Sequence, residues 1–171
     1  LYSFSFTGSV GHTPEAEMVQ GSDGAFYGTT ASGTQDPIRG TVFRMSLPAP
    51  MTIQFSAANY SVGEGGAAAN ITVSRIGETT DAATVDYATS HTAALNNCDL
   101  VNGVASSRCD YPTSVGTIRF AVGETSKTVS IPLVDDSYAE GNESFTITLS
   151  NVIGATLGSP STATVTISDN E

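Results

Sequence analysis

An acidic stretch between residues 133 and 145 holds the side chains of this chain that are best suited to chemistry. It places Asp135, Asp136, Glu140 and Glu143 within nine residues, although only 13% of all residues are charged. Two unscreened carboxylates about 4 Å apart repel each other by about 4 kcal/mol at an effective dielectric of 20. The stretch therefore either stays solvated as an exposed acidic loop or binds a cation, and taken alone it leaves both interpretations open.

We expect these acids to be positioned by β-strands and turns. Valine, threonine, serine, glycine and alanine dominate the 171 residues, and 39% hydrophobic content supplies a core, a composition that favours strands and turns over helices. No segment shows a convincing period of 3.6 residues. From residue 51 onward we expect seven short strands: Met51 to Ser56, Ala69 to Ile76, Ala83 to Thr89, Gly116 to Ala121, Lys127 to Val134, Glu143 to Ser150 and Thr162 to Ser168.

Seven strands at this spacing, separated by turns such as 76–79 and 122–125, predict a β-sandwich. Two segments, 128–131 and 145–149, alternate between threonine or serine and apolar residues, so their threonines should face outward. The residues assigned to the core are Val129, Ile131, Phe145, Ile147 and Leu149.

A sandwich gathers its loops at two ends, so acids that are far apart in the sequence can meet at one of them. Glu64 follows the first strand, Asp110 leads into the fourth, and Asp169 and Glu171 follow the last. We expect them at the same pole as the acidic loop. Calcium takes six to eight oxygen ligands and tolerates adjustable loops better than magnesium does. Eight carboxylates exceed the needs of one ion, which predicts more than one Ca2+ with shared ligands.

The charge balance argues against several other functions. Seventeen acids against six lysines and arginines give a net charge of −11, which disfavours binding to nucleic acid or to anionic lipid. No apolar run is long enough to span a bilayer and no signal segment opens the chain, so we expect no direct membrane insertion and interpret the sequence as a mature fragment.

Enzymatic chemistry is also not expected. No Gly-x-Ser-x-Gly elbow surrounds any serine. Glu140 and Glu143 could be drawn as a glycosidase acid pair, but the chain contains no tryptophan to stack on sugar.

The two cysteines, Cys98 and Cys109, lie in a polar segment rich in asparagine and serine. Paired, they would close a short loop and stabilise the fold by roughly 3 kcal/mol, and a disulfide indicates an oxidising compartment. Two free thiols in a cytosolic protein are the alternative, whereas the histidine spacing does not fit a zinc site.

The first 47 residues differ in sequence pattern from the rest of the chain, and they predict a β-meander. Its elements are a turn at 22–24 between short strands at 18–20 and 25–27, and alternating segments at 1–6 and 40–45. Pro48 and Pro50 indicate a stiff linker, 48–50, before a second domain at 51–171. The segments Leu1 to Phe4, Gln20 to Thr30 and Gly40 to Phe43 resemble one copy of a bacterial extracellular tandem repeat called GloVer. A single repeat cannot bury its apolar face alone, which implies packing against a neighbouring domain or another chain.

Residues 51–171 resemble a Calx-beta domain, the immunoglobulin-like module of sodium/calcium exchangers, integrin β4 and many bacterial surface proteins. The segments that carry this resemblance are Tyr60 to Gly66, Val85 to Thr89, Asp110–Tyr111, Gly116 to Phe120, Gly123 to Val129, Asp135–Asp136, Glu140 to Glu143 and Ala163 to Asp169. It implies an all-β, seven-stranded Greek-key sandwich. It also implies calcium ligands at the matching positions, which are Glu64, Asp110, Asp135, Asp136, Glu140, Glu143, Asp169 and Glu171.

The chain departs from the family pattern in three places. Ser137 stands where a third acid often follows the paired aspartates, and Asn170 interrupts the terminal acidic run, so fewer ions are expected. An insertion that bears the cysteines replaces the usual segment after the third strand, and a disulfide there would hold Asp110 in position. A purely structural acidic tip remains the alternative to a metal site.

These features lead to an expected function. We expect a non-enzymatic, secreted or surface-attached bacterial module for structure and adhesion, in which calcium rigidifies the tip. Its partners would be neighbouring domains or other copies of itself, joined by strand addition into fibres or filaments. The alternative is a calcium-sensing or carbohydrate-binding accessory domain of a larger secreted enzyme.

Overall fold

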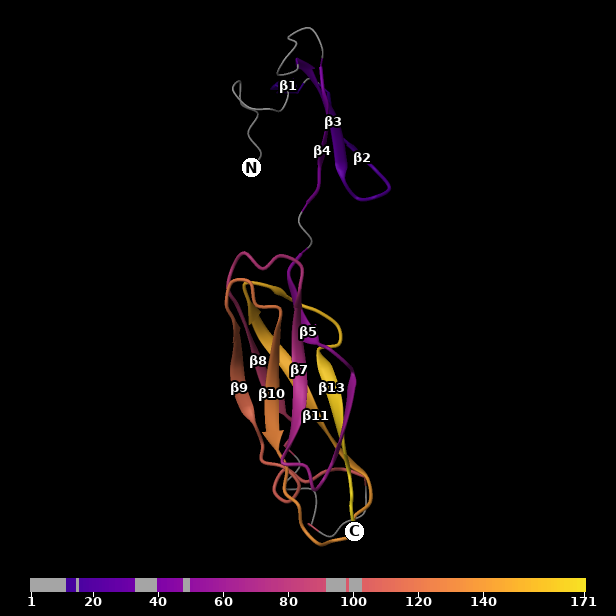
Figure 1. Cartoon of the computed structure of the whole chain (residues 1–171), viewed down its shortest axis with the longest axis vertical. Helices are drawn as coiled ribbons and strands as arrows, with labels where there is room; N and C mark the ends of the chain where they lie inside the picture. Colours follow the sequence, from indigo (N-terminus) through magenta and orange to yellow (C-terminus); the bar gives the residue numbers. More distant parts are fainter. Residues whose placement is uncertain (1–11, 15, 33–39, 48–49, 92–97, 99–102) are drawn as a thin grey trace. The chain divides into compact units, whose positions relative to one another are not determined.

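The computed structural model describes residues 12–14, 16–32, 40–47, 50–91, 98 and 103–171 (Figure 1). The chain divides into two compact units, Leu1–Pro48 and Ala49–Glu171. The described residues form strands and turns without a helix, and none of them belongs to a helix long and apolar enough to cross a membrane.

The smaller unit contains a four-stranded sheet built around one central strand. That strand, β3 (Phe26–Ser32), pairs antiparallel with β1 (His12–Pro14), β2 (Val19–Gln20) and β4 (Val42–Met45). The predicted turn lies between β2 and β3, where Gly24 adopts a positive φ of 76° that suits glycine. The predicted segment 1–6 lies outside the described residues.

The larger unit is a β-sandwich of two sheets. One sheet has the order β10-β7-β5-β12 and the other β6-β13-β11-β8-β9. Their strands are β5 (Thr52–Phe55), β6 (Asn59–Gly63), β7 (Ala68–Ile76), β8 (Ala83–Thr89), β9 (Val115–Phe120), β10 (Ser126–Pro132), β11 (Glu143–Ile153), β12 (Thr156–Leu157) and β13 (Thr162–Ser168).

Alternating burial follows the sequence pattern that predicted the core. Along β10 and β11, Val129 and Ile131 are buried between exposed neighbours, and so are the three apolar residues of 145–149. The threonines of these segments, such as Thr146 and Thr148, are exposed as expected. Both predicted turns also occur, with Gly77 at φ 93° and Gly123 at φ 82°. The predicted β-sandwich is therefore confirmed.

Two strands occur in addition to the seven expected. β6 pairs parallel with β13, and β12 pairs parallel with β5. Both lie at a sheet edge and bond only one neighbour. β6 alternates between exposed and half-buried residues, but its partner strand β13 lies about a hundred residues further along the chain. β12 is only two residues long, which is too short to show a period.

Candidate metal centre

The strand directions bring the predicted acids to one pole of the sandwich (Figure 1). β6 and β13 run parallel and end at this pole, where Glu64 and Asp169 follow them. β10 also ends here and leads into Asp135 and Asp136, while β11 starts here at Glu143. The amide of Glu64 donates a hydrogen bond of 2.9 Å to the carbonyl of Ser168, the residue before Asp169. This bond holds Glu64 next to the end of β13.

Seven of the eight predicted carboxylates gather in three overlapping clusters. In each cluster, one carboxylate oxygen per residue lies within 4.8 Å of the others. The inner cluster comprises Asp110, Glu140 and Glu143, the middle cluster Glu64, Asp136 and Glu140, and the outer cluster Glu64, Asp169 and Glu171. Asp135 stays outside these clusters and is exposed, although its charge contributes to the raised pKa of Glu171.

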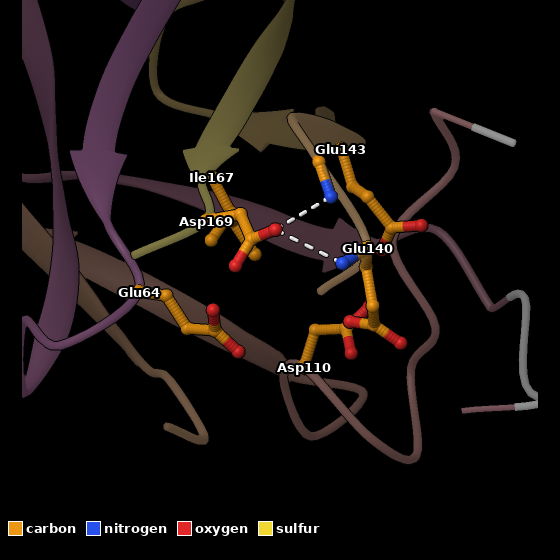
Figure 2. A pocket seen from close by; sticks show the side chains of 7 residues that line it. Glu64, Asp110, Glu140, Glu143, Ile167 and Asp169 are labelled. Carbon is orange, nitrogen blue, oxygen red and sulfur yellow. Dashed lines mark hydrogen bonds between the residues drawn. The ribbon is translucent and has the colours of Figure 1, made fainter. Parts of the chain in front are cut away.

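Asp169 organises the loop that carries the middle of the site. Its Oδ2 atom accepts hydrogen bonds from the amides of Glu140 at 2.9 Å and Gly141 at 2.7 Å (Figure 2). Its Oδ1 atom accepts a third from the amide of Glu171 at 3.1 Å. Amide donors, led by that of Gly141, lower the pKa of Asp169, which keeps this carboxylate charged.

Asp110 is buried, with 4% of its surface exposed. Its Oδ2 atom accepts a hydrogen bond from the amide of Ser106. Its Oδ1 atom is buried and accepts no hydrogen bond from an amide, hydroxyl or basic group among the described residues. Asp110 lines a pocket together with Glu64, Glu140, Glu143 and Asp169 (Figure 2). A buried oxygen without a donor is costly, and a cation in this pocket would satisfy it.

Burial and mutual repulsion raise the pKa of several of these acids. Burial, followed by the charge of Asp110, raises the pKa of Glu140 to about 7. Burial, followed by a side-chain hydrogen bond with Asp110 and by the charge of Asp110, raises the pKa of Glu143 to about 8. Burial is also the main cause of the raised pKa of Glu64 and of Glu171. Several neighbouring carboxyls with raised pKa values indicate a site that would bind a cation, because a positive charge would favour their ionised form.

No basic side chain supplies that charge within the described structure. The two ion pairs found there, Arg44–Asp23 and Lys127–Glu124, include none of the clustered carboxylates. All the candidate donors are carboxylate oxygens, the hard ligands that calcium prefers and that zinc or copper sites seldom use alone. The residues present therefore fit a calcium ion.

The structure joins Cys98 to Cys109 in a disulfide, with Cα atoms 5.5 Å apart, so the free-thiol alternative does not hold. Cys109, one end of the bridge, directly precedes Asp110 in the sequence.

Backbone groups that the sequence did not predict also shape the site, above all the amides of Ser106 and Gly141. No residue type marks such a donor, because every residue except proline carries a backbone amide.

Known proteins resemble the part of the chain that carries the acidic clusters. The Calx-beta domain family matches residues 48–171. Sodium/calcium exchanger 1 of Canis lupus familiaris is 33% identical over 138 residues, which cover 70% of this chain and 13% of the exchanger. Extracellular matrix organizing protein FRAS1 of Mus musculus is 32% identical over 124 residues, covering 70% of this chain and 3% of that protein.

Solved structures agree with the sequence match. The apo-form Calx CBD1 domain superposes with a TM-score of 0.62 at 28% identity, over 72% of this chain and 100% of that one. The calcium binding domain CBD12 of CALX1.1 gives 0.59 at 30% identity, over 68% of this chain and 45% of that one. The chain thus spans a small part of its exchanger and FRAS1 relatives, and through residues 48–171 it belongs to the Calx-beta domain family.

Proposed function

We propose that this chain is a non-enzymatic calcium-binding module whose acidic pole is held together by Ca2+. The observation that carries the proposal is the buried Oδ1 atom of Asp110, which accepts no hydrogen bond from an amide, hydroxyl or basic group of the described residues and belongs to a pocket with four other carboxylates. The ligands would come from the inner, middle and outer clusters, with Asp135 available at the rim. The calcium binding domain of CALX1.1 is a relative of this region, which supports the same ion.

Thermal melting with and without calcium tests this proposal. Ca2+ at millimolar concentration should raise the melting temperature by several degrees, because a ligand that binds only the folded state at 100 times its dissociation constant adds about 2.7 kcal/mol. Mg2+ at the same concentration should act more weakly, since it demands a strict octahedron.

A matched pair of variants locates the effect. Glu143→Gln removes a buried carboxylate of the inner cluster and should reduce the calcium response. Glu78→Gln makes the same chemical change at an exposed position at the other pole and should leave the response intact. A wild-type melting curve that calcium does not shift would remove the metal from this account.

The wider role is proposed as structural and adhesive, in a secreted or surface-attached protein of bacterial origin. The support is an acidic pole that follows the last strand, where calcium could fix the angle to a neighbouring domain, and the disulfide, which suits an oxidising compartment. Residues 1–47 would be one GloVer-like repeat. Its exposed Val19 and Val42 favour contact with neighbouring domains or other copies of the chain.

Two further measurements separate this role from its competitors. Electron microscopy at high protein concentration should show fibres or filaments, and uniform monomers would argue against self-assembly by strand addition. Micromolar binding on a sugar array would favour the alternative, a carbohydrate-binding accessory domain of a larger secreted enzyme. A calcium sensor would instead change its shape in solution on binding calcium.

A further inference from the structure

The segment 103–111, between β8 and β9, is anchored directly beside the inner cluster. Ser144, the residue after Glu143, donates its amide to the carbonyl of Gly103 at 3.1 Å. The carbonyl of Ser144 in turn accepts a bond of 3.0 Å from the amide of Ala105. The inserted segment therefore runs alongside the start of β11, next to one of the buried glutamates.

The second half of this segment turns around Ser106. The carbonyl of Ser106 accepts bonds from the amides of Cys109 at 3.3 Å, Asp110 at 3.1 Å and Tyr111 at 3.4 Å. Its own amide donates to Oδ2 of Asp110, and both residues are buried. This turn fixes the Asp110 carboxylate with one oxygen held by the protein and the other left for the pocket.

Asp110 is also held from its C-terminal side. Its carbonyl accepts a bond of 2.9 Å from the amide of Val134, just beyond β10. Tyr111 stacks on Phe145 with ring centroids 4.0 Å apart and donates its hydroxyl to the carbonyl of Ser90 at 2.8 Å.

The N-terminal side of Asp110 is held by a covalent bond. Cys109, only 6% exposed, is bonded to Cys98, and its Sγ atom lies 3.5 Å from the hydroxyl oxygen of Ser106. The disulfide thus closes the same turn that orients the carboxylate.

We propose that the Cys98–Cys109 disulfide and the Ser106 turn position Asp110 for calcium, so that opening the disulfide weakens the inner cluster and spares the outer one. This inference rests on the proposed calcium binding. Without the bridge, the turn samples other conformations, and the apparent dissociation constant rises by the inverse of the fraction that keeps Asp110 in place. A fraction of one in ten gives about tenfold weaker binding.

Opening the bridge needs a dithiol as reductant. One thiolate of the dithiol attacks a sulfur of the bridge and forms a mixed disulfide, and its second thiol then displaces the protein sulfur. The dithiol ends as a cyclic disulfide, while Cys98 and Cys109 take up its two electrons and two protons and become thiols.

The test is a double-mutant cycle read by calcium titration calorimetry on the full chain. Cys98→Ser with Cys109→Ser should weaken calcium binding at the inner cluster by about tenfold. Asp110→Asn should weaken it as well. Combining all three changes should cause no further loss beyond Asp110→Asn, because the bridge acts through that carboxylate.

Glu171→Gln provides the matched comparison, because it alters the outer cluster. In the Glu171→Gln background, removal of the cysteines should weaken calcium binding by the same factor as in the wild-type chain. If removal of the cysteines costs as much in the Asp110→Asn background as in wild type, the disulfide acts through general stability and the positioning role is overturned.

The remaining outcomes are also decisive. A wild-type protein that binds no calcium overturns the proposed function and this inference with it, whereas unchanged binding after loss of the bridge overturns the inference alone. If the serine variant does not fold, the wild-type chain reduced by dithiothreitol is titrated in its place. Unfolding of that form too would make the bridge a stability element and overturn the proposal.

Discussion

Glu140 and Glu143 are glutamates whose side chains are buried among other acids, and this makes the stability of the metal-free protein depend on pH. Their pKa values, raised to about 7 and about 8, exceed the value of an unfolded glutamate. The folded state therefore keeps protons that the unfolded state has lost. Stability from this source is full below the unfolded pKa and disappears as the pH rises through the folded values.

We therefore predict that the metal-free protein melts at lower temperature as the pH rises from about 5.5 to about 8. The slope is up to about 1.4 kcal/mol per pH unit for each proton fully retained. Glu143→Gln should flatten this slope, while Glu78→Gln should not. Saturating calcium should also flatten it, because metal binding displaces the protons. A metal-free melting temperature that is flat or rises over this range would contradict the raised pKa values.

At the scale of elements, the sequence predicted the strands in which apolar and polar residues alternate. The stretches around Val129 and Ile147 have one buried face, and a period of two is visible in such strands. β6 and its pairing with β13 were not predicted, since contacts between segments a hundred residues apart leave no local pattern. The convergence of Glu64 and Asp169 was expected from the loop positions and the family resemblance, whereas the contact between Ser106 and Asp110 depends on backbone geometry that no residue type reveals.

Arg75 in β7 is an element-scale feature at the pole opposite the acids. Only 3% of it is exposed, and its guanidinium donates to the carbonyls of Ala121 at 3.2 Å, Glu78 at 3.2 Å and Asp81. One buried side chain thus ties the β7–β8 loop to the β9–β10 loop. No carboxylate is among these partners.

We predict that Arg75→Leu lowers the stability of the larger unit by about 1 to 3 kcal/mol, because the three carbonyls lose their donor. This corresponds to a fall of roughly 4 to 12 °C in melting temperature. Arg119→Leu, which removes the same charge from an exposed position in β9, should change stability by less than about 0.5 kcal/mol. Neither change should alter calcium affinity, and a loss of affinity in Arg75→Leu would show that the two poles are coupled.

At the scale of the whole molecule, the hydrophobic core cluster and the candidate calcium ligands among the described residues both lie in the larger unit. Every residue of the hydrophobic core cluster lies between Ile53 and Ile167, and all seven clustered carboxylates lie between Glu64 and Glu171. The family match covers the same part of the chain. A domain of this size can bury enough surface to fold alone.

We therefore predict that residues 49–171, produced without the first unit, melt within about 2 °C of the same transition in the full chain, a difference below about 1 kcal/mol. Calcium should raise that transition by the same amount in both proteins, because every candidate ligand is retained. Calorimetry of the two proteins, each with and without calcium, makes the comparison. A shortened protein that melts much earlier but keeps its calcium response would show that the first unit stabilises the sandwich. Loss of the response alone would show that residues 1–48 contribute to the site.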